Sequence, residues 1–192
     1  MDGLRTVIAG ADLSFRKKLK EKLMMAGILV VGEASDGWNA LRMVLNIQPD
    51  LVILHARLSG RDGLEVAKFV EEHRIAPVIL YADAEKLSAI REMLGHWVVT
   101  YLLEPVEEQS LLPAIDFSLA VHRRITAMEE QNKKLLQTLE TRKLVDRAKG
   151  LLIAEKGMSE QQAFRYLQKL SMDKCLPVEK VAGKVIKLLQ AK

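Results

Sequence analysis

The stretch "PDLVILHARLSGRDGLE", residues 49–65, decides the fold of the chain. Its apolar run "DLVIL" (50–54) has the length of a buried strand, and the chain then turns through Gly60 and Gly63 into a helix predicted over 63–74. Strands this uniformly apolar are typical of a parallel sheet whose two faces are both covered. The residue that follows the apolar run is His55.

The same alternation of strand and helix patterns fills the first 120 residues. Further strands are predicted over 4–9, 28–33, 77–81 and 98–103, and further helices over 13–26, 36–48, 84–95 and from about residue 107 onward. Five strand–helix units of this kind predict an α/β domain with a doubly wound, five-stranded parallel sheet. In such a sheet the functional crevice lies at the carboxyl ends of the strands.

One long helix is predicted across the middle of the chain, since residues 114–156 contain no proline and their first glycine is Gly150. Alternate steps of three and four residues from Ser118 to Arg142 pick out a heptad seam. The candidate dimerisation positions on this seam are Val121, Ile125, Met128, Asn132, Leu135 and Leu139. We therefore expect a coiled-coil linker over 118–142 that forms a parallel homodimer, with Asn132 fixing the register. The alternative is that the stripe packs on the chain's own domain.

A small helical unit is predicted after the seam. The long helix ends at Gly157, a second helix begins after Ser159 with Gln162 completing a capping box, and a third begins near Pro177. The apolar positions spaced to bury against one another include Leu151, Leu152, Ala163, Leu167, Leu170, Val181, Val185 and Leu188.

Charge is distributed unevenly along the 192 residues, although the formal net charge is only +4. Residues 1–140 hold 17 Lys and Arg against 20 Asp and Glu, a net −3, whereas residues 141–192 hold 12 against 5, a net +7. A bias confined to a short segment indicates a polyanion-binding module attached to a near-neutral domain. The alternative is a solvated helical surface.

Several classes of protein are excluded by composition. The single cysteine, Cys175, cannot form an internal disulfide and has no companion for a thiolate zinc site. The sequence lacks an apolar run of about 18 residues and an N-terminal signal pattern. We expect a cytoplasmic protein that makes no use of a membrane.

Residues 4–122 closely resemble the receiver domain of bacterial response regulators, in strand order, in loop positions and in the stretch 49–65. The resemblance implies a flavodoxin-like receiver domain over 1–122. Family members carry an acidic pair after the first strand, an acceptor Asp after the third, a Thr or Ser after the fourth, and a Lys before a proline after the fifth. The corresponding positions here are Gly10, Ala11, His55, Tyr81 and Glu104, the last directly before Pro105.

These departures remove the chemistry of aspartyl phosphorylation. Mg²⁺ prefers octahedral oxygen coordination, and Gly10 and Ala11 supply no side-chain oxygen. Asp12, one position further on, would be a poor site alone. Glu104 would repel phosphoryl oxygens where a lysine normally stabilises them. We therefore expect a pseudo-receiver without phosphorylation, bound metal, cofactor or enzymatic activity.

His55 and Glu104 are expected to approach each other at the strand ends. One interpretation is a structural hydrogen bond that fills the vacated pocket. The other is a pH-sensitive pair, because histidine changes its charge near neutral pH.

Residues 136–192 resemble the ANTAR module, the output domain of AmiR- and NasR-type transcription antitermination regulators. The match is strongest in "RAKGLLIAEKGMSEQQAFRYLQKLSMDKCLPVEKVA" (147–182), where Ala148, Lys149 and Gly150 fall on the family's Ala-Lys-Gly core. The resemblance implies binding to paired RNA hairpin loops in nascent leader transcripts, which prevents formation of a terminator. Control by a ligand-sensing protein partner is also implied, with control of abundance as the alternative.

Cationic and planar side chains of this segment are candidates for RNA contact. The candidate RNA-binding residues are Arg142, Lys143, Arg147, Lys149, Gly150, Lys156, Arg165, Tyr166 and Gln168. Gly150 would permit close approach of RNA or of a neighbouring helix. Tyr166 has an equal alternative role in the small core.

Two other functions stay open at the level of sequence. A DNA-binding transcription factor of the response-regulator type is one, although the third helix lacks a cluster of residues suited to base edges before Gln190. An interaction scaffold that binds no nucleic acid is the other.

Overall fold

The computed structural model describes residues 3–95, 98–105 and 108–190. Its strands are β1 (Arg5–Ala9), β2 (Leu29–Ala34), β3 (Leu51–His55), β4 (Val78–Ala82) and β5 (Thr100–Leu103). Its helices are α1 (Leu13–Met25), α2 (Gly37–Ile47), α3 (Gly63–Glu72), the 3₁₀ turn η1 (Ala84–Lys86), α4 (Leu87–Leu94), α5 (Glu108–Lys156), α6 (Glu160–Asp173) and α7 (Val178–Gln190).

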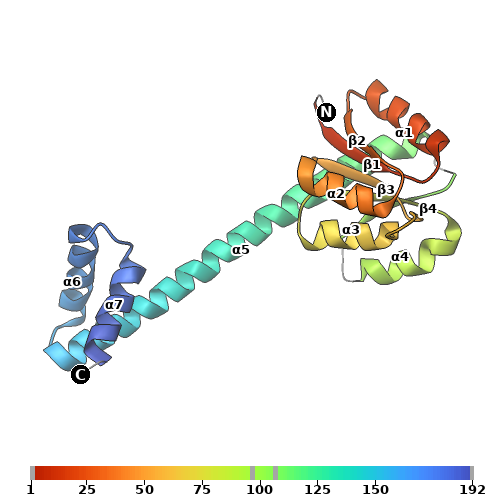
Figure 1. Cartoon of the computed structure of the whole chain (residues 1–192). Coiled ribbons are helices and arrows are strands. Elements are labelled where there is room, and N and C mark those ends of the chain that lie inside the picture. Colours follow the sequence, from red (N-terminus) through yellow and green to blue (C-terminus); the bar gives the residue numbers. More distant parts are fainter. Residues whose placement is uncertain (1–2, 96–97, 106–107, 191–192) are drawn as a thin grey trace. The chain divides into compact units, whose positions relative to one another are not determined.

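The strands form one parallel sheet in the order β2-β1-β3-β4-β5, as Figure 1 shows. The predicted doubly wound α/β fold is confirmed, and each predicted strand agrees with the observed one to within two residues at either end. The pairing of β3 with β4 sets His55 opposite Tyr81 at the carboxyl edge of the sheet.

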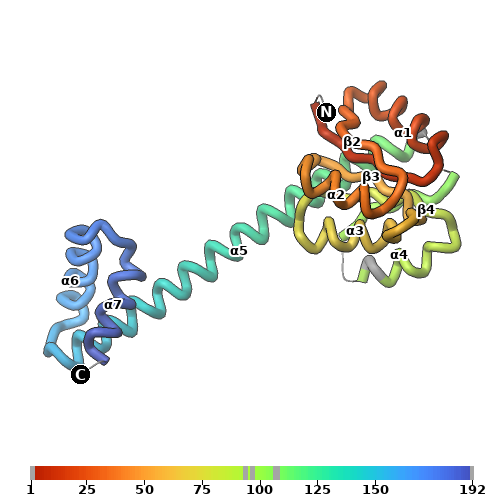
Figure 2. Tube along the Cα trace, in the orientation of Figure 1, coloured from red at the N-terminus to blue at the C-terminus, as the bar shows by residue number. Residues whose placement is uncertain are grey.

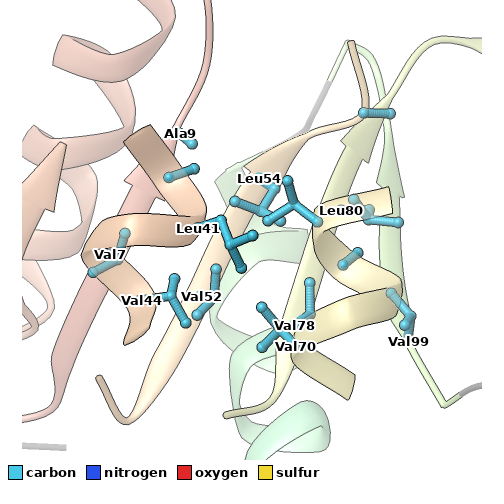
Figure 3. Close-up of a cluster of buried hydrophobic side chains, with 14 of the residues drawn as sticks. Val7, Ala9, Leu41, Val44, Val52, Leu54, Val70, Val78, Leu80 and Val99 are labelled. Carbon is cyan, nitrogen blue, oxygen red and sulfur yellow. The ribbon is translucent and has the colours of Figure 1, made fainter. Parts of the chain in front are cut away.

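Both faces of the central strands β1, β3 and β4 are buried, and neighbouring residues of each strand point to opposite faces. Val52 and Leu54 of β3 pack with residues of α2, α3 and α4, in the cluster that Figure 3 shows. Leu51 and Ile53 pack on the other face, against α1 and the first turns of α5. This arrangement fixes the strand ends, and therefore the residues that follow them, between two layers of helices.

The chain divides into two compact units, Met1–Thr126 and Ala127–Lys192. Helix α5 contributes to both, and Figure 2 traces it as one continuous helix. Pro113 lies inside the helix, in its second turn, and lacks the backbone N–H that would otherwise donate to the carbonyl of Gln109.

The predicted heptad seam is split between the two units. Ser118 is buried in the first unit, and Val121 and Ile125 line a small cavity there with Pro77 and Val98. The later positions Met128, Leu135 and Leu139 are exposed at 53–61%. The first part of the stripe therefore packs on its own domain, and the second part is free of intrachain packing.

The second unit has a core of its own, made by the end of α5 with α6 and α7. Ala148, Leu152, Ala163, Leu167 and Val181 are almost completely buried in it. The predicted capping box is confirmed: the Gln162 N–H donates to the Ser159 hydroxyl, and the Ser159 N–H donates to Oε1 of Gln162.

Leu188 was predicted in this core and is instead 72% exposed. Leu189 packs against the core in its place. With 3.6 residues per turn, Leu189 follows Val185 and Ile186 on the buried stripe of α7, whereas Leu188 points about 100° away. Within residues 3–95, 98–105 and 108–190, no helix combines the length and apolar character needed to cross a bilayer.

Candidate functional site

The five positions predicted from the strand ends are gathered at the carboxyl edge of the sheet. Gly10 and Ala11 follow β1, His55 ends β3, Tyr81 lies in β4, and Glu104 follows β5. Backbone hydrogen bonds hold this edge: Gly10 N–H donates to the Ala34 carbonyl and Glu104 N–H to the Ala82 carbonyl. The crevice expected from the sequence is therefore present.

The ring of Phe15 lies in this crevice, beside a cavity of about 550 Å³ that Tyr81 and Glu104 also line. It stands edge-on to His55, with 5.6 Å between ring centroids, and edge-on to Tyr81, with 5.2 Å. A Cβ atom at Gly10 would lie only 2.6 Å from the Phe15 ring. A side chain at Gly10 and the present position of Phe15 are therefore incompatible.

A guanidinium group occupies the loop after β1. Arg16 donates hydrogen bonds to the carbonyl oxygens of Gly10 and Ala11. Asp12 caps α1, and its Oδ1 accepts the Ser14 N–H at 2.8 Å. The positive charge of Arg16 and the ring of Phe15 therefore both lie against the predicted positions Gly10 and Ala11.

The donor set does not fit a divalent cation. Gly10 and Ala11 have no ligating side chain, and Asp12 is the nearest carboxylate in the loop. In the described part of the chain, no three His, Cys, Asp or Glu side chains come together as a possible metal site. Mg²⁺ needs several oxygen ligands, and an adjacent guanidinium would repel it.

His55 and Glu104 make the contact that the sequence predicted. Nε2 of His55 lies 3.4 Å from Oε1 of Glu104. Nδ1 of His55 lies against the backbone of Arg57, 3.0 Å from its nitrogen and 3.2 Å from its carbonyl oxygen. The imidazole at the predicted acceptor position is therefore in contact with a carboxylate on one side and with the backbone on the other.

Tyr81, the residue predicted at the hydroxyl position, carries a buried phenol. Burial, and then the negative charge of Glu104, raise the pKa of Tyr81 well above its usual value. The phenol therefore stays neutral in the physiological range and adds no charge to the site.

Ion pairs tie together the two loops beside this site. Arg57, after β3, pairs with Asp83 at 2.7 Å and with Glu85, both after β4. Lys86, after β4, pairs at 2.8 Å with Asp62, after β3, so in this pair the cation comes from the loop after β4. Desolvation tends to raise the pKa of Asp83, but the hydrogen bonds from Lys86 N–H and Arg57 outweigh it and leave that pKa lowered.

In the second unit, the predicted cation Lys149 is held inside an ion-pair cluster. Its Nζ lies 2.8 Å from Oδ1 of Asp146 and 3.0 Å from Oε1 of Glu160, and the side chain is only 17% exposed. Hydrogen bonds to Asp146 and then Glu160 raise the pKa of Lys149. Lys149 therefore joins α5 to the first turn of α6.

The other predicted cations differ in their pairing. Arg142 pairs with Asp146 at 3.8 Å, and Lys143 pairs with Glu140 at 2.8 Å. Arg147, Lys156 and Arg165 are exposed, and within the described residues they have no ion pair. Unpaired cations are the ones that can meet a phosphate without first losing a carboxylate.

The structure does not bring all these cations onto one side of α5. Arg142, Lys149 and Lys156 recur every seven residues and share one flank. Arg147 precedes Lys149 by two residues and so points about 160° away from it. Lys143 lies one turn before Arg147 on that second side.

The aromatic side chains of α6 have different environments. Tyr166 is half-buried and packs against the core of the second unit, as its alternative role predicted. Phe164, which the sequence analysis did not select, is 43% exposed. Gln168 is exposed on the same helix. A Cβ at Gly150 would meet no atom within 4 Å, so intrachain packing does not require this glycine.

The sequence signal for Phe15 and Arg16 lies in their spacing along α1. Phe15 precedes Leu19 by four residues, which puts it on the face of α1 that covers the sheet, and Arg16 follows Asp12 by one turn. That spacing predicts burial, but it does not give the direction of either side chain at the helix N-terminus.

Comparison with known proteins agrees with both parts of the chain. The response regulator receiver domain model matches residues 7–116, and the ANTAR domain model matches residues 133–186. The transcriptional regulatory protein PdtaR of Mycobacterium tuberculosis is 36% identical over 185 residues, which cover 96% of this chain and 90% of that protein.

Solved structures share the fold of the first unit. The signal receiver domain of the putative response regulator NarL from Mycobacterium tuberculosis aligns with a TM-score of 0.57 and 24% identity, over 62% of this chain and 98% of that one. The CheX-CheY-BeF3-Mg complex from Borrelia burgdorferi aligns with a TM-score of 0.55 and 20% identity, over 59% and 87%. The chain therefore belongs to the ANTAR-domain response regulators, transcription regulators in which a receiver domain is followed by an ANTAR domain.

Proposed function

We propose that this chain is an RNA-binding antitermination regulator whose receiver-like domain accepts no phosphoryl group. The single observation that carries the proposal is the altered loop after β1: Phe15 and Arg16 lie against Gly10 and Ala11, where a receiver holds a cation, while the ANTAR domain has a packed three-helix core. The regulator therefore has an output module and no phosphoryl switch.

The loss of phosphorylation follows from several groups acting together. Transfer to a carboxylate needs a cation, an acceptor and a stabilising positive charge near the new phosphoryl oxygens. His55 holds the predicted acceptor position, with Nε2 3.4 Å from the Glu104 carboxylate and Nδ1 against the Arg57 backbone. Glu104 adds negative charge where a lysine would neutralise it. Restoring one group would not restore the others.

Binding to RNA is supported by the ANTAR match and by the exposed cations of the second unit. Arg147, Lys156 and Arg165 are available to phosphates, and Phe164 and Gln168 are available to unstacked bases. Hairpin loops present such bases, whereas duplex DNA hides their faces. The proposed target is a leader transcript with two hairpins.

A homodimer is supported by the exposed second half of the heptad seam. Met128, Leu135 and Leu139 leave an apolar stripe in water, with Asn132 among them as the polar register position. Burying this stripe against a second copy is the simplest way to remove it from solvent. Two copies of the ANTAR domain would also match two hairpins in one transcript.

Because aspartyl phosphate has no site, the controlling signal enters by another route. A ligand-sensing protein that binds the receiver-like domain or the coil is one route, and control of abundance is the other. Capture of a partner by the full chain, with and without Asn132→Leu, would distinguish a coil-binding sensor from one that binds the receiver-like domain.

The RNA proposal is tested by direct competition. The full chain is titrated in moderate salt against a labelled RNA of two tandem hairpins and against duplex DNA of similar length. We expect tighter binding to the RNA. Equal or tighter binding to the DNA would assign the chain to the DNA-binding alternative, and binding to neither would favour an interaction scaffold.

A further inference from the structure

Helix α7 carries a row of exposed lysines that lies outside the candidate RNA-binding residues of α5 and α6. Lys180, Lys184 and Lys187 recur at intervals of four and three residues, so they share one face of the helix. All three are exposed, and within residues 3–95, 98–105 and 108–190 none of them has an ion pair.

The opposite face of α7 fixes the direction of this row. Val181, Ala182, Val185 and Ile186 are buried in the core of the second unit. A helix anchored along one stripe presents the opposite stripe to solvent in a fixed orientation. The three ammonium groups are therefore displayed by a rigid element and not by a loop.

No carboxylate of α7 compensates these charges. Glu179 is the one acidic residue in the sequence 178–190, and its Oε2 accepts a hydrogen bond from the Thr141 hydroxyl of α5 at 2.9 Å. On α5, by contrast, Arg142, Lys143 and Lys149 each have a carboxylate partner. The three lysines of α7 are therefore more available to a phosphate than the paired cations of α5.

We propose that Lys180, Lys184 and Lys187 of α7 bind the sugar-phosphate backbone of the RNA, each meeting a separate phosphate. This inference rests on the proposed RNA-binding function and adds a second contact surface to it. Lysine is a flexible point charge that suits a phosphate better than a base edge. The contacts therefore supply affinity and position the RNA, and they carry no sequence specificity.

The spacing of the row suits such a contact. Along the helix axis the lysines lie about 6 Å and about 4.5 Å apart, at 1.5 Å per residue. Their four-carbon stems let each ammonium group move to its own phosphate. Among the described residues, no intrachain ion pair has to be broken when a polyanion binds here. The attraction between the lysines and the phosphates is therefore not reduced by the loss of such a pair.

The test compares two triple variants of the full chain with the same loss of charge. One is Lys180→Gln, Lys184→Gln and Lys187→Gln. The matched control is Lys17→Gln, Lys18→Gln and Arg91→Gln, three exposed cations of the first unit without an ion pair among the described residues. Affinity for a labelled tandem-hairpin RNA is measured over a series of salt concentrations, after circular dichroism has verified the helix content.

For the α7 variant we expect the slope of log affinity against log salt to become shallower by about 2 to 3, since each lost phosphate contact removes about 0.7 to 0.9. The control should keep the slope of the unchanged chain. Single substitutions should each remove about 0.7 to 0.9, which keeps the test decisive if the triple variant folds poorly.

An unchanged slope in the α7 variant would overturn the inference and leave the RNA-binding function intact. Equal changes in both triple variants would also overturn it, since they would reflect net charge and not a contact. Failure of the unchanged chain to prefer the tandem-hairpin RNA over duplex DNA would instead reject the proposed function itself.

Discussion

The ring of Phe15 stands edge-on to the imidazole of His55, with 5.6 Å between centroids and 82° between planes. Edge-to-face packing of this kind is favourable between aromatic groups. The same ring also meets Tyr81 and excludes a side chain at Gly10. The residues that depart from the receiver pattern are therefore linked through the Phe15 ring, beside a cavity of about 550 Å³ that Tyr81 and Glu104 also line.

The packing of Phe15 against Gly10 predicts opposite effects at two glycines. Gly10→Ala should destabilise the chain by about 1 to 3 kcal/mol, because its Cβ would overpack the ring. Gly150→Ala is the matched control: its Cβ meets nothing, and alanine should stabilise the helix by up to about 1 kcal/mol. Chemical denaturation of both variants gives the free energies of unfolding. A neutral Gly10→Ala would mean that Phe15 can leave the crevice.

The exposed half of the seam predicts the behaviour of Asn132. Asn132→Leu should change the oligomer state or tighten the dimer, because a polar core position specifies register at a cost in stability. RNA affinity per site should not change. Gln131→Leu adds the same apolar group next to the seam, and it should leave the oligomer state unchanged. Light scattering during gel filtration reports both, and identical behaviour of the two variants would remove Asn132 from the interface.

Arg147 and Lys149 are expected to differ although both are cations of α5. Arg147→Ala should weaken RNA binding and make its salt dependence shallower by about 1, with folding unchanged. Lys149→Ala should weaken binding and also lower the melting temperature, because it removes the partner of Glu160 and leaves Asp146 only its longer pair with Arg142. RNA titration and thermal unfolding measure the two effects. Unchanged RNA affinity in both variants would exclude these residues from the RNA interface.

The ion-pair cluster also predicts a pH dependence. A hydrogen bond from Lys149 is the main cause that lowers the pKa of Asp146 below its ordinary value of 3.8. This hydrogen bond stabilises the folded chain fully above pH 3.8. The stabilisation is lost as the pH falls through the lower pKa that Asp146 has in the folded state. Between about pH 5 and pH 3, the melting temperature of the unchanged chain should therefore fall more than that of Asp146→Asn. Glu155→Gln, which removes an exposed carboxylate, serves as the control, and equal falls in all three proteins would contradict the linkage.

The sequence alone predicts the helices and strands and identifies the residues that follow each strand. Apolar runs, glycines and capping residues act locally, so strand ends such as His55 and caps such as Ser159 are specified within a few residues. The contacts of Phe15 with His55 and Tyr81 were not predicted, because they depend on the direction of one side chain on a neighbouring helix. The pairing of Lys149 with Glu160 depends likewise on how α6 returns to α5. Only the first part of the heptad seam packs on the first unit. The heptad pattern continues without interruption along α5, so it does not indicate where this packing ends.

The most direct test measures phosphorylation of the chain and its affinity for RNA in the same sample. The full chain is incubated with a small-molecule phosphodonor and Mg²⁺, and its intact mass and its affinity for tandem-hairpin RNA are then determined in the same sample. We predict an unchanged mass and an unchanged affinity that exceeds the affinity for duplex DNA. A mass increase of one phosphoryl group together with an altered RNA affinity would contradict the account.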